Sequence, residues 1–216
     1  MSLQSKPTLM PDLALVRARE NDPATMSDAQ ARSEQIYARL SSALLTSLSN
    51  AALREKQPLK KIVWLRRLAD QLGPATQGIA PCRDGCAHCC HTPVLLSRVE
   101  AEVIAKETGA TLQTPRDRSM MNRTNRAYIG VPCPFLRESR CSIYASRPFV
   151  CRTHYNLDAD NLLCRLIPGE PVKVPYLDHK PFDEVHVSAL GKKALQFFDI
   201  RDFFGVLPND HNQWKA

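Results

Sequence analysis

Two stretches in the first half of the chain carry apolar residues every three to four positions, the spacing of an amphipathic α-helix. The first helix is expected to begin at Ser27, a suitable N-cap, with Asp28 favourable in its first turn. Its apolar face comprises Ile36, Leu40, Leu44 and Leu48. The second is expected to begin at Pro58 and to end at Gly73 and Pro74. Its apolar face comprises Ile62, Leu65, Leu68 and Leu72.

A third helix is expected over residues 97–108. Ser97 and Glu100 have the spacing of a capping box, and Gly109 is suited to close the last turn. The remaining expectations, in chain order, are a poorly ordered arm over residues 1–24, a basic helix over 115–128, an irregular proline-rich run over 168–181 and a last helix over 184–204.

These elements predict a mainly α fold with irregular loops and few or no strands. We expect the two N-terminal helices to form an antiparallel pair that packs on a small cysteine-rich domain stapled by metal. The expected division is a flexible arm over 1–24, a helical extension over 25–78, a cysteine-cluster domain over 79–170, and a proline-rich segment with a C-terminal helix over 171–216.

Composition agrees with a protein that buries a core, since 44% of the 216 residues are hydrophobic. No apolar run approaches the roughly 18–20 residues of a membrane helix, and the N-terminal residues lack the features of a secretory signal. We therefore expect a cytoplasmic protein without a membrane partner. In that reducing compartment, cysteines favour metal binding, whereas in a secreted protein eight cysteines would suit four disulfides.

The formal net charge of +7 raises the question of a nucleic-acid partner. The basic residues are thinly spread, however, and aromatic residues, at 6%, are not interleaved with them to stack bases. Two basic clusters stand out, Lys60, Lys61, Arg66 and Arg67, and Arg116, Arg118, Arg123 and Arg126. We expect solvated basic faces there, not a nucleic-acid site.

All eight cysteines fall in one part of the chain, between Cys82 and Cys164. The expected metal ligands are Cys82, Cys86, Cys89, Cys90, Cys133, Cys141, Cys151 and Cys164. The first four form C-x3-C-x2-C-C, and a short loop of this kind can direct several sulfurs at one ion, about 2.3 Å away in zinc sites. Gly85 relaxes that loop where the backbone must turn. The distal cysteines would complete the coordination.

The vicinal pair Cys89 and Cys90 constrains how the metal is bound. Adjacent side chains diverge, so the two thiols are expected to serve different sites or different corners of a cluster. Eight thiolates admit two four-sulfur zinc sites, one iron–sulfur cluster with spare cysteines, or a binuclear site. The first three cysteines also match the C-x3-C-x2-C spacing of radical S-adenosylmethionine enzymes, but the chain lacks the repeated strand–helix alternation of their barrel.

The segments PCRDGCAHCC and PCPFLRESRCSIYASRPFVCR, followed by Cys164, resemble the YkgJ-like or CxxCxxCC family of zinc- or iron-chelating cysteine-cluster proteins. The resemblance covers roughly residues 80–165, and Ala87 or His88 stands where the family has a glycine. It implies a cluster that chelates zinc or iron, with an iron–sulfur cluster admitted. The family also includes a flagellin lysine N-methylase, which implies the alternative of an iron–sulfur redox enzyme or a methyltransferase-like protein.

Other residues near the cysteines are secondary candidates. Arg147 and Arg152 are expected either to compensate thiolate charge or to form surface salt bridges. His88, His91 and His154 are weaker candidate ligands, whereas His179, His186 and His211 are expected to be structural or at the surface. The sequence shows no nucleophile–base pair, carboxylate dyad or phosphate loop, so neither a catalytic residue nor an enzymatic activity is assigned. A protein partner stays open beside the metal.

Overall fold

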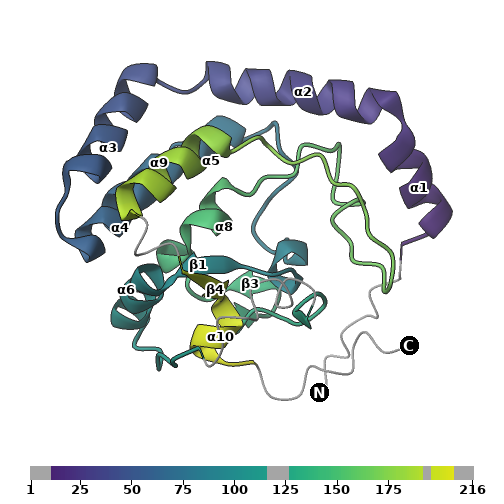
Figure 1. Ribbon diagram of the computed structural model, residues 1–216. Coiled ribbons are helices and arrows are strands. Elements are labelled where there is room, and N and C mark those ends of the chain that lie inside the picture. Colours follow the sequence, from purple (N-terminus) through teal and green to yellow (C-terminus); the bar gives the residue numbers. More distant parts are fainter. Residues whose placement is uncertain (1–10, 116–126, 192–195, 207–216) are drawn as a thin grey trace.

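The computed structural model describes residues 11–115, 127–191 and 196–206, and these ranges are mainly helical, as predicted (Figure 1). The α-helices are α1 (Leu13–Asn21), α2 (Pro23–Ala38), α3 (Ser42–Arg54), α4 (Pro58–Ala69), α5 (Leu72–Thr76), α6 (Arg98–Thr108), α8 (Phe149–Thr153), α9 (Lys180–Leu190) and α10 (Ile200–Phe204). The short strands are β1 (Leu95–Ser97), β2 (Leu136–Arg137), β3 (Arg140–Cys141) and β4 (Phe197–Asp199), and the 3-10 helices are η1 (His88–His91) and η2 (Tyr144–Ser146). None of the helices within these ranges combines the length and the apolar character needed to cross a membrane.

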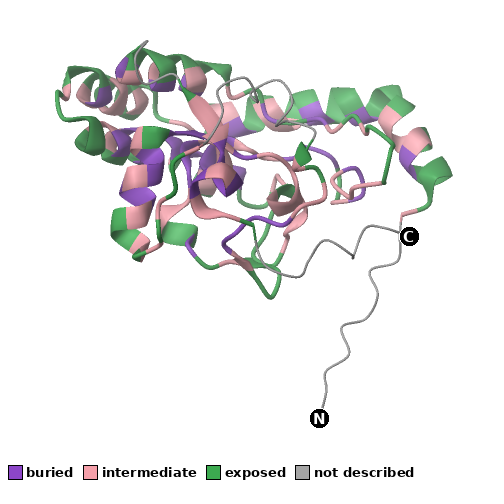
Figure 2. Ribbon diagram, turned by 60° about the horizontal axis from the view of Figure 1, so that its bottom comes forward, coloured by how far each residue is buried: buried purple, intermediate pink, exposed green. Residues whose placement is uncertain are grey.

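The helices α3, α4 and α9 form the upper layer of the molecule and pack against one another (Figure 1). Ile62, Leu65 and Leu68 on α4 are at most 2% exposed, which confirms the predicted apolar face of this helix. The face predicted for the first helix is only partly correct, because Ile36 is buried while Leu44 is exposed. Figure 2 shows the same division, with exposed residues on the outer faces of the helices.

The structure changes three predicted helix boundaries. Ser27 does not cap a helix, because α2 begins earlier, at Pro23, with the side chain of Asp22 as its cap. A new helix starts after Ser41, whose side chain accepts a hydrogen bond from the backbone N–H of Leu44. Gly73 and Pro74 do not end α4, which stops at Ala69, but lie in the short helix α5. Proline is tolerated there because the first N–H groups of a helix have no intrahelical partner.

A second apolar cluster lies below this layer, formed by β1, α6, α10 and the segment around residues 133–143. The strand β1 pairs antiparallel with β4, about 100 residues later, so that Leu96 faces Phe198 across the two-stranded sheet. The predicted capping box of α6 is confirmed, and its last turn closes at Gly109 with a left-handed φ of 71°. The last helix predicted over 184–204 is wrong, since α9 ends at Leu190 and β4 and α10 follow.

The N-terminal helices α1 and α2 run along the outside of the molecule and lie beside the loop that follows α8 (Figure 1). The poorly ordered arm expected over 1–24 is thus wrong for α1, where Asp12 caps the helix and Val16 is fully buried against Leu162 and Leu163. Short polar helices of this kind are stabilised by packing that local periodicity does not report. The basic helix expected over 115–128 lies largely outside the described residues.

Candidate metal centre

Short elements and loops present the eight cysteines. Cys82 and Cys86 lie in the loop after α5, where Gly85 turns with a φ of 81°. Cys89 and Cys90 follow on η1. The others come from separate parts of the chain: Cys133 before β2, Cys141 at the end of β3, Cys151 in α8 and Cys164 in the loop beyond it. All eight are free thiols, so each is available as a donor.

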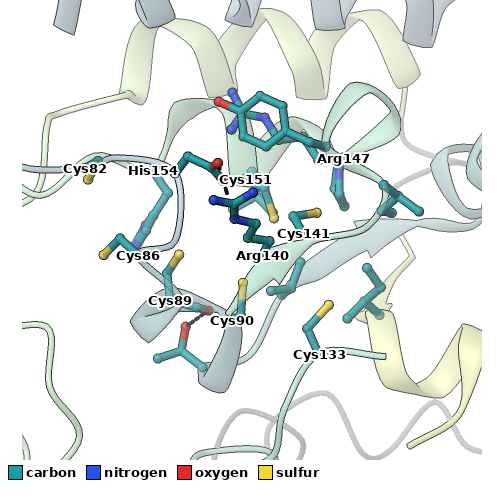
Figure 3. A pocket seen from close by; sticks show the side chains of 18 of the residues that line it. Cys82, Cys86, Cys89, Cys90, Cys133, Arg140, Cys141, Arg147, Cys151 and His154 are labelled. Carbon is teal, nitrogen blue, oxygen red and sulfur yellow. Dashed lines mark hydrogen bonds and ion pairs between the residues drawn. The ribbon is translucent and has the colours of Figure 1, made fainter. Parts of the chain in front are cut away.

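Seven of the eight cysteines line one cavity of about 210 Å³ (Figure 3). Figure 3 shows the sulfurs of Cys141 and Cys151 facing the side of η1 from which Cys89 and Cys90 project. Cys164 lies outside this lining, close enough to the first cysteine loop for the negative charges of Cys82 and Cys86 to raise its pKa, in addition to burial. The structure therefore brings the predicted ligands together from distant parts of the sequence.

Backbone N–H groups are already directed at several sulfurs. Three thiols accept a hydrogen bond from the N–H two residues further along the chain: Cys86 from His88, Cys133 from Phe135 and Cys141 from Ile143. Burial raises the pKa of each of these thiols, to about 11 for Cys133, and the N–H donor opposes that rise. Such donors stabilise the thiolate, the form of cysteine that binds metal.

The thiols of Cys89 and Cys90 hydrogen-bond to each other. This bond lowers the pKa of Cys89 and raises the pKa of Cys90, because one sulfur holds the proton that the other accepts. Cys151 is raised well above the usual cysteine pKa, chiefly by burial. A metal ion entering the cavity must therefore displace protons from several thiols.

Arg147 is the principal positive charge beside the sulfurs. Its guanidinium lies 4.1 Å from the ring centroid of Tyr144 and lines the cavity. Burial raises the pKa of Cys141 and Cys151, and the charge of Arg147 opposes this effect. Arg140 also lines the cavity and forms an ion pair with Asp84 at 3.5 Å, which links β3 to the first cysteine loop.

Arg152 has a different position from Arg147. It is 5% exposed and bridges the end of α4 to the loop before α8, through Asp70 and the backbone carbonyls of Ala145 and Arg147. Burial raises the pKa of Cys141 and the charge of Arg152 opposes this rise, as expected of a residue that compensates thiolate charge, but its hydrogen bonds go to Asp70 and to backbone carbonyls. It does not form a surface salt bridge, because its own side chain is buried. Its buried contacts hold the helix α8, which carries Cys151, against the end of α4.

The histidines beside the cysteines have identifiable partners. The Nε2 atom of His88 accepts a hydrogen bond from the side chain of Asn161 at 3.2 Å, and Nδ1 of His91 donates to the carbonyl of Ala87 at 3.1 Å. His154 lines the cavity and lies 4.2 Å from the ring of Tyr176. Burial lowers the pKa of His154 to about 4, so that its imidazole is neutral at physiological pH.

The other three histidines were expected to be structural or at the surface. Nδ1 of His179 donates to the carboxylate of Asp183 at 2.7 Å, one helical turn away. His186 is 7% exposed and lies 3.4 Å from the carboxylate of Glu100, stacked on Phe149. His211 lies outside the described residues.

Two buried polar residues, whose role at the site the sequence did not predict, hold the cysteine segments in place. Glu100 is buried and accepts a hydrogen bond from the backbone N–H of Phe149 at 3.0 Å, which fixes the start of α8. Arg201 on α10 is also buried and donates to the carbonyl of Cys90 at 3.2 Å and to that of Pro132, next to Cys133. A capping box was the only sequence signal for Glu100, and Arg201 had none.

The clustered thiols suit a thiophilic metal such as zinc or iron. Backbone N–H groups and a positive charge lie beside the sulfurs and would stabilise the thiolates that bind it. Among the described residues, no three His, Cys, Asp or Glu side chains already stand together as a ready-made set of ligands. The sulfurs would therefore have to draw together on an ion, which couples metal binding to the folding of this region.

Comparison with known proteins agrees with this chemistry. The comparisons with curated proteins and with solved structures give no match. A family model does match, and its description is "Putative zinc- or iron-chelating domain". The matched residues, 81–166, contain all eight cysteines and most of the cavity lining. Over this segment the chain is thus similar to the CxxCxxCC family, as the resemblance of its cysteine motifs predicted.

Proposed function

We propose that this protein is a metal-binding protein that chelates zinc or iron through its eight cysteines. The observation that supports this most strongly is the gathering of seven thiols, from four separate chain segments, around one cavity. A metal ion shared by these thiols accounts for the arrangement, since it stabilises thiolates that would otherwise repel one another. The matched family model supports the same metals.

The proposal extends to the compartment. Free thiols gathered in this way would oxidise to disulfides in the secretory pathway, so a reducing compartment such as the cytoplasm suits the arrangement. An iron–sulfur cluster belongs to the same proposal as a finer alternative, because four thiolates are also its usual ligands.

The test is anaerobic purification of the full chain, followed by metal analysis, assay of acid-labile sulfide and an absorption spectrum. Stoichiometric zinc or iron is expected. Coloured protein with labile sulfide would identify an iron–sulfur cluster, and colourless protein with zinc would identify a thiolate zinc site. Folded protein that carries no metal after expression in zinc- and iron-supplemented medium would contradict the proposal.

Substitutions inside the cavity are compared with one remote from it as the control for this test. Replacing Cys151 and Cys141 with serine is expected to reduce the metal content, because both face the cavity. Replacing Ser42 with alanine, at the start of the remote helix α3, is expected to leave the metal content unchanged. Equal metal content in Cys141→Ser, Cys151→Ser and Ser42→Ala would show that the metal is bound elsewhere.

A further inference from the structure

The packing of the eight cysteines divides them into two sets of four. One set contributes to the apolar cluster below the helical layer: Cys90, Cys133, Cys141 and Cys151. These four, the inner set, pack with Val94, Phe135, Ile143 and Ile200. The other four, the outer set, take no part in that cluster: Cys82, Cys86, Cys89 and Cys164. Cys133 is buried, whereas Cys82 and Cys89 are exposed.

Backbone contacts hold the inner set together independently of this packing. The N–H of Cys133 donates to the carbonyl of Cys90 at 2.7 Å, which joins two segments more than 40 residues apart. The guanidinium of Arg201 also donates to this carbonyl, at 3.2 Å. Cys141 follows on the β2–β3 hairpin, where the N–H of Ser142 donates to the carbonyl of Phe135 at 2.9 Å.

A different group of contacts holds the outer set. The backbone N–H of Asn156 donates to the sulfur of Cys82, and the side chain of Asn161 donates to His88, between Cys86 and Cys89. Both asparagines belong to the loop that carries Cys164. This loop therefore contacts the first cysteine loop at two points.

Cys89 lies next to Cys90 on η1, at the junction between the two sets. Its exposure and its place outside the apolar cluster assign it to the outer set. Its neighbour Cys90 packs in the cluster. The vicinal pair is thus the point at which the two sets meet.

We propose that the protein holds two separate metal ions in two unlike four-thiolate sites, an inner one formed by Cys90, Cys133, Cys141 and Cys151 and an outer one formed by Cys82, Cys86, Cys89 and Cys164. This inference rests on the proposed function and deepens it. Four thiolates are the usual complement of a closed zinc site. The apolar surroundings shield the inner ion from water, so it exchanges slowly, while the outer ion lies under an exposed loop and exchanges readily.

The vicinal pair supplies a matched test, because Cys89→Ser and Cys90→Ser make the same chemical change at adjacent positions. Each variant and the unaltered full chain are loaded with Zn²⁺, and transfer of the ion to a chromogenic chelator is followed over time. The unaltered chain should release two equivalents in a fast and a slow phase. Cys89→Ser should lose the fast phase and keep the slow one, and Cys90→Ser should lose the slow phase.

Cadmium-113 nuclear magnetic resonance of the unaltered chain supports this test if Cys90→Ser fails to fold, because two sites give two resonances with four-sulfur shifts. One resonance, one equivalent of zinc, or loss of both phases in Cys89→Ser would overturn the inference while leaving metal binding intact. Labile sulfide with four irons would overturn it too, in favour of a single cluster. Folded protein with no bound metal at all would instead refute the proposed function on which the inference rests.

Discussion

The side chain of Arg201 has no exposed surface, and neither does that of its ion-pair partner Asp199, 2.9 Å away. The guanidinium also donates to four backbone carbonyls: Cys90, Thr92, Val131 and Pro132. Removing one partner of a buried pair leaves an uncompensated charge, which costs more than the pair itself contributes. At the residue scale, the Arg201–Asp199 pair and these four carbonyl contacts are the main polar interactions that hold the segments of the inner cysteines.

We expect Arg201→Met to lower the free energy of unfolding by about 3–5 kcal/mol, because the carboxylate of Asp199 and the four carbonyls lose their donor. The measurement is urea unfolding of the metal-loaded protein followed by circular dichroism. Arg98→Met is the matched control, since Arg98 is half-exposed and pairs with an exposed Glu102, a contact worth at most about 1 kcal/mol. Equal losses of unfolding free energy in the two variants would show that the buried contacts of Arg201 contribute no more than a surface pair.

Glu100 is a second buried polar residue at this scale, and its contribution depends on pH. Burial raises the pKa of Glu100, but the bonds from His186 and from the N–H groups of Phe149 and Ser97 outweigh burial and lower it. Because the pKa in the folded protein lies below that of the unfolded chain, Glu100 stabilises the fold above its unfolded pKa. This stabilisation is lost as the pH falls through the folded pKa.

Glu100→Gln is therefore expected to be less stable than the unaltered protein by about 1–3 kcal/mol at neutral pH, with the difference shrinking in acid. Denaturant unfolding at a series of pH values measures that difference directly. Glu102→Gln, on the exposed side of the same helix, provides the control and should show little difference at any pH. A gap between Glu100→Gln and the unaltered protein that widens in acid would reverse the sign we assign.

At the scale of the elements, α1 and α2 act on the candidate metal centre through the loop of residues 156–178. Arg19 of α1 pairs with the buried Asp158 at 3.1 Å, and Arg32 of α2 donates to the carbonyl of Leu157 at 2.7 Å. The sequence predicts a flexible arm over residues 1–24 and a helical extension over 25–78. The structure instead makes α1 and α2 the support of the loop that carries Cys164.

Replacing Arg19 with alanine should loosen this loop, because Asp158 then stays buried without its charged partner. A lost hydrogen bond to a charged group costs about 1.5–3 kcal/mol, so amide exchange in residues 156–166 should accelerate about tenfold or more. Hydrogen exchange measured by mass spectrometry gives the rate for this segment. Arg54→Ala, an exposed change at the end of α3, should leave it unaltered. Unchanged exchange in Arg19→Ala would show that α1 does not hold the loop.

Local signals predicted some elements well and others not at all. The limits of α6 followed from the capping box at Ser97 and from Gly109, because each acts within one helical turn. The buried face of α4 followed from its periodicity. The strands β1 and β4 are three residues long and stabilise each other only across the fold, so neither carries a pattern of its own.

The candidate site was predicted unevenly for the same reason. Close spacing predicted the cysteines as candidate ligands, since four lie within nine residues. Their division into two sets depends on which apolar side chains surround each sulfur, and spacing does not report this. Arg201 and Asp199 looked like ordinary charged residues on a helix, because burial of a charge is decided by its tertiary partners.

At the scale of the whole molecule, the two apolar clusters differ in whether they contain candidate metal ligands. The upper cluster is formed mainly by α2, α3, α4 and α9 and contains no cysteine. The lower cluster contains the four inner cysteines. The two are joined through α8, since Phe149 packs in the upper cluster and Cys151, two residues later, in the lower one.

Removal of metal by a strong chelator under reducing conditions should therefore affect the two clusters unequally. We expect most of the far-ultraviolet helical signal to persist, because the upper helices pack without the thiols. Amide protection of α10 and of the β2–β3 hairpin should fall, and the midpoint of thermal unfolding should drop. Loss of the entire helical signal would show that the fold depends on metal as a whole, and unchanged protection would show that metal is not structural.

Arg19 and Arg201 lie on either side of residues 81–166, the segment that matches the family model, and both reach into it. We therefore expect the segment that bears the motif to depend for its stability on side chains outside it. If only residues 81–166 were moved to a new chain, the side chains that hold them at both ends would be left behind. In evolutionary terms, we expect the transferable unit to be larger than the signature by which it is recognised.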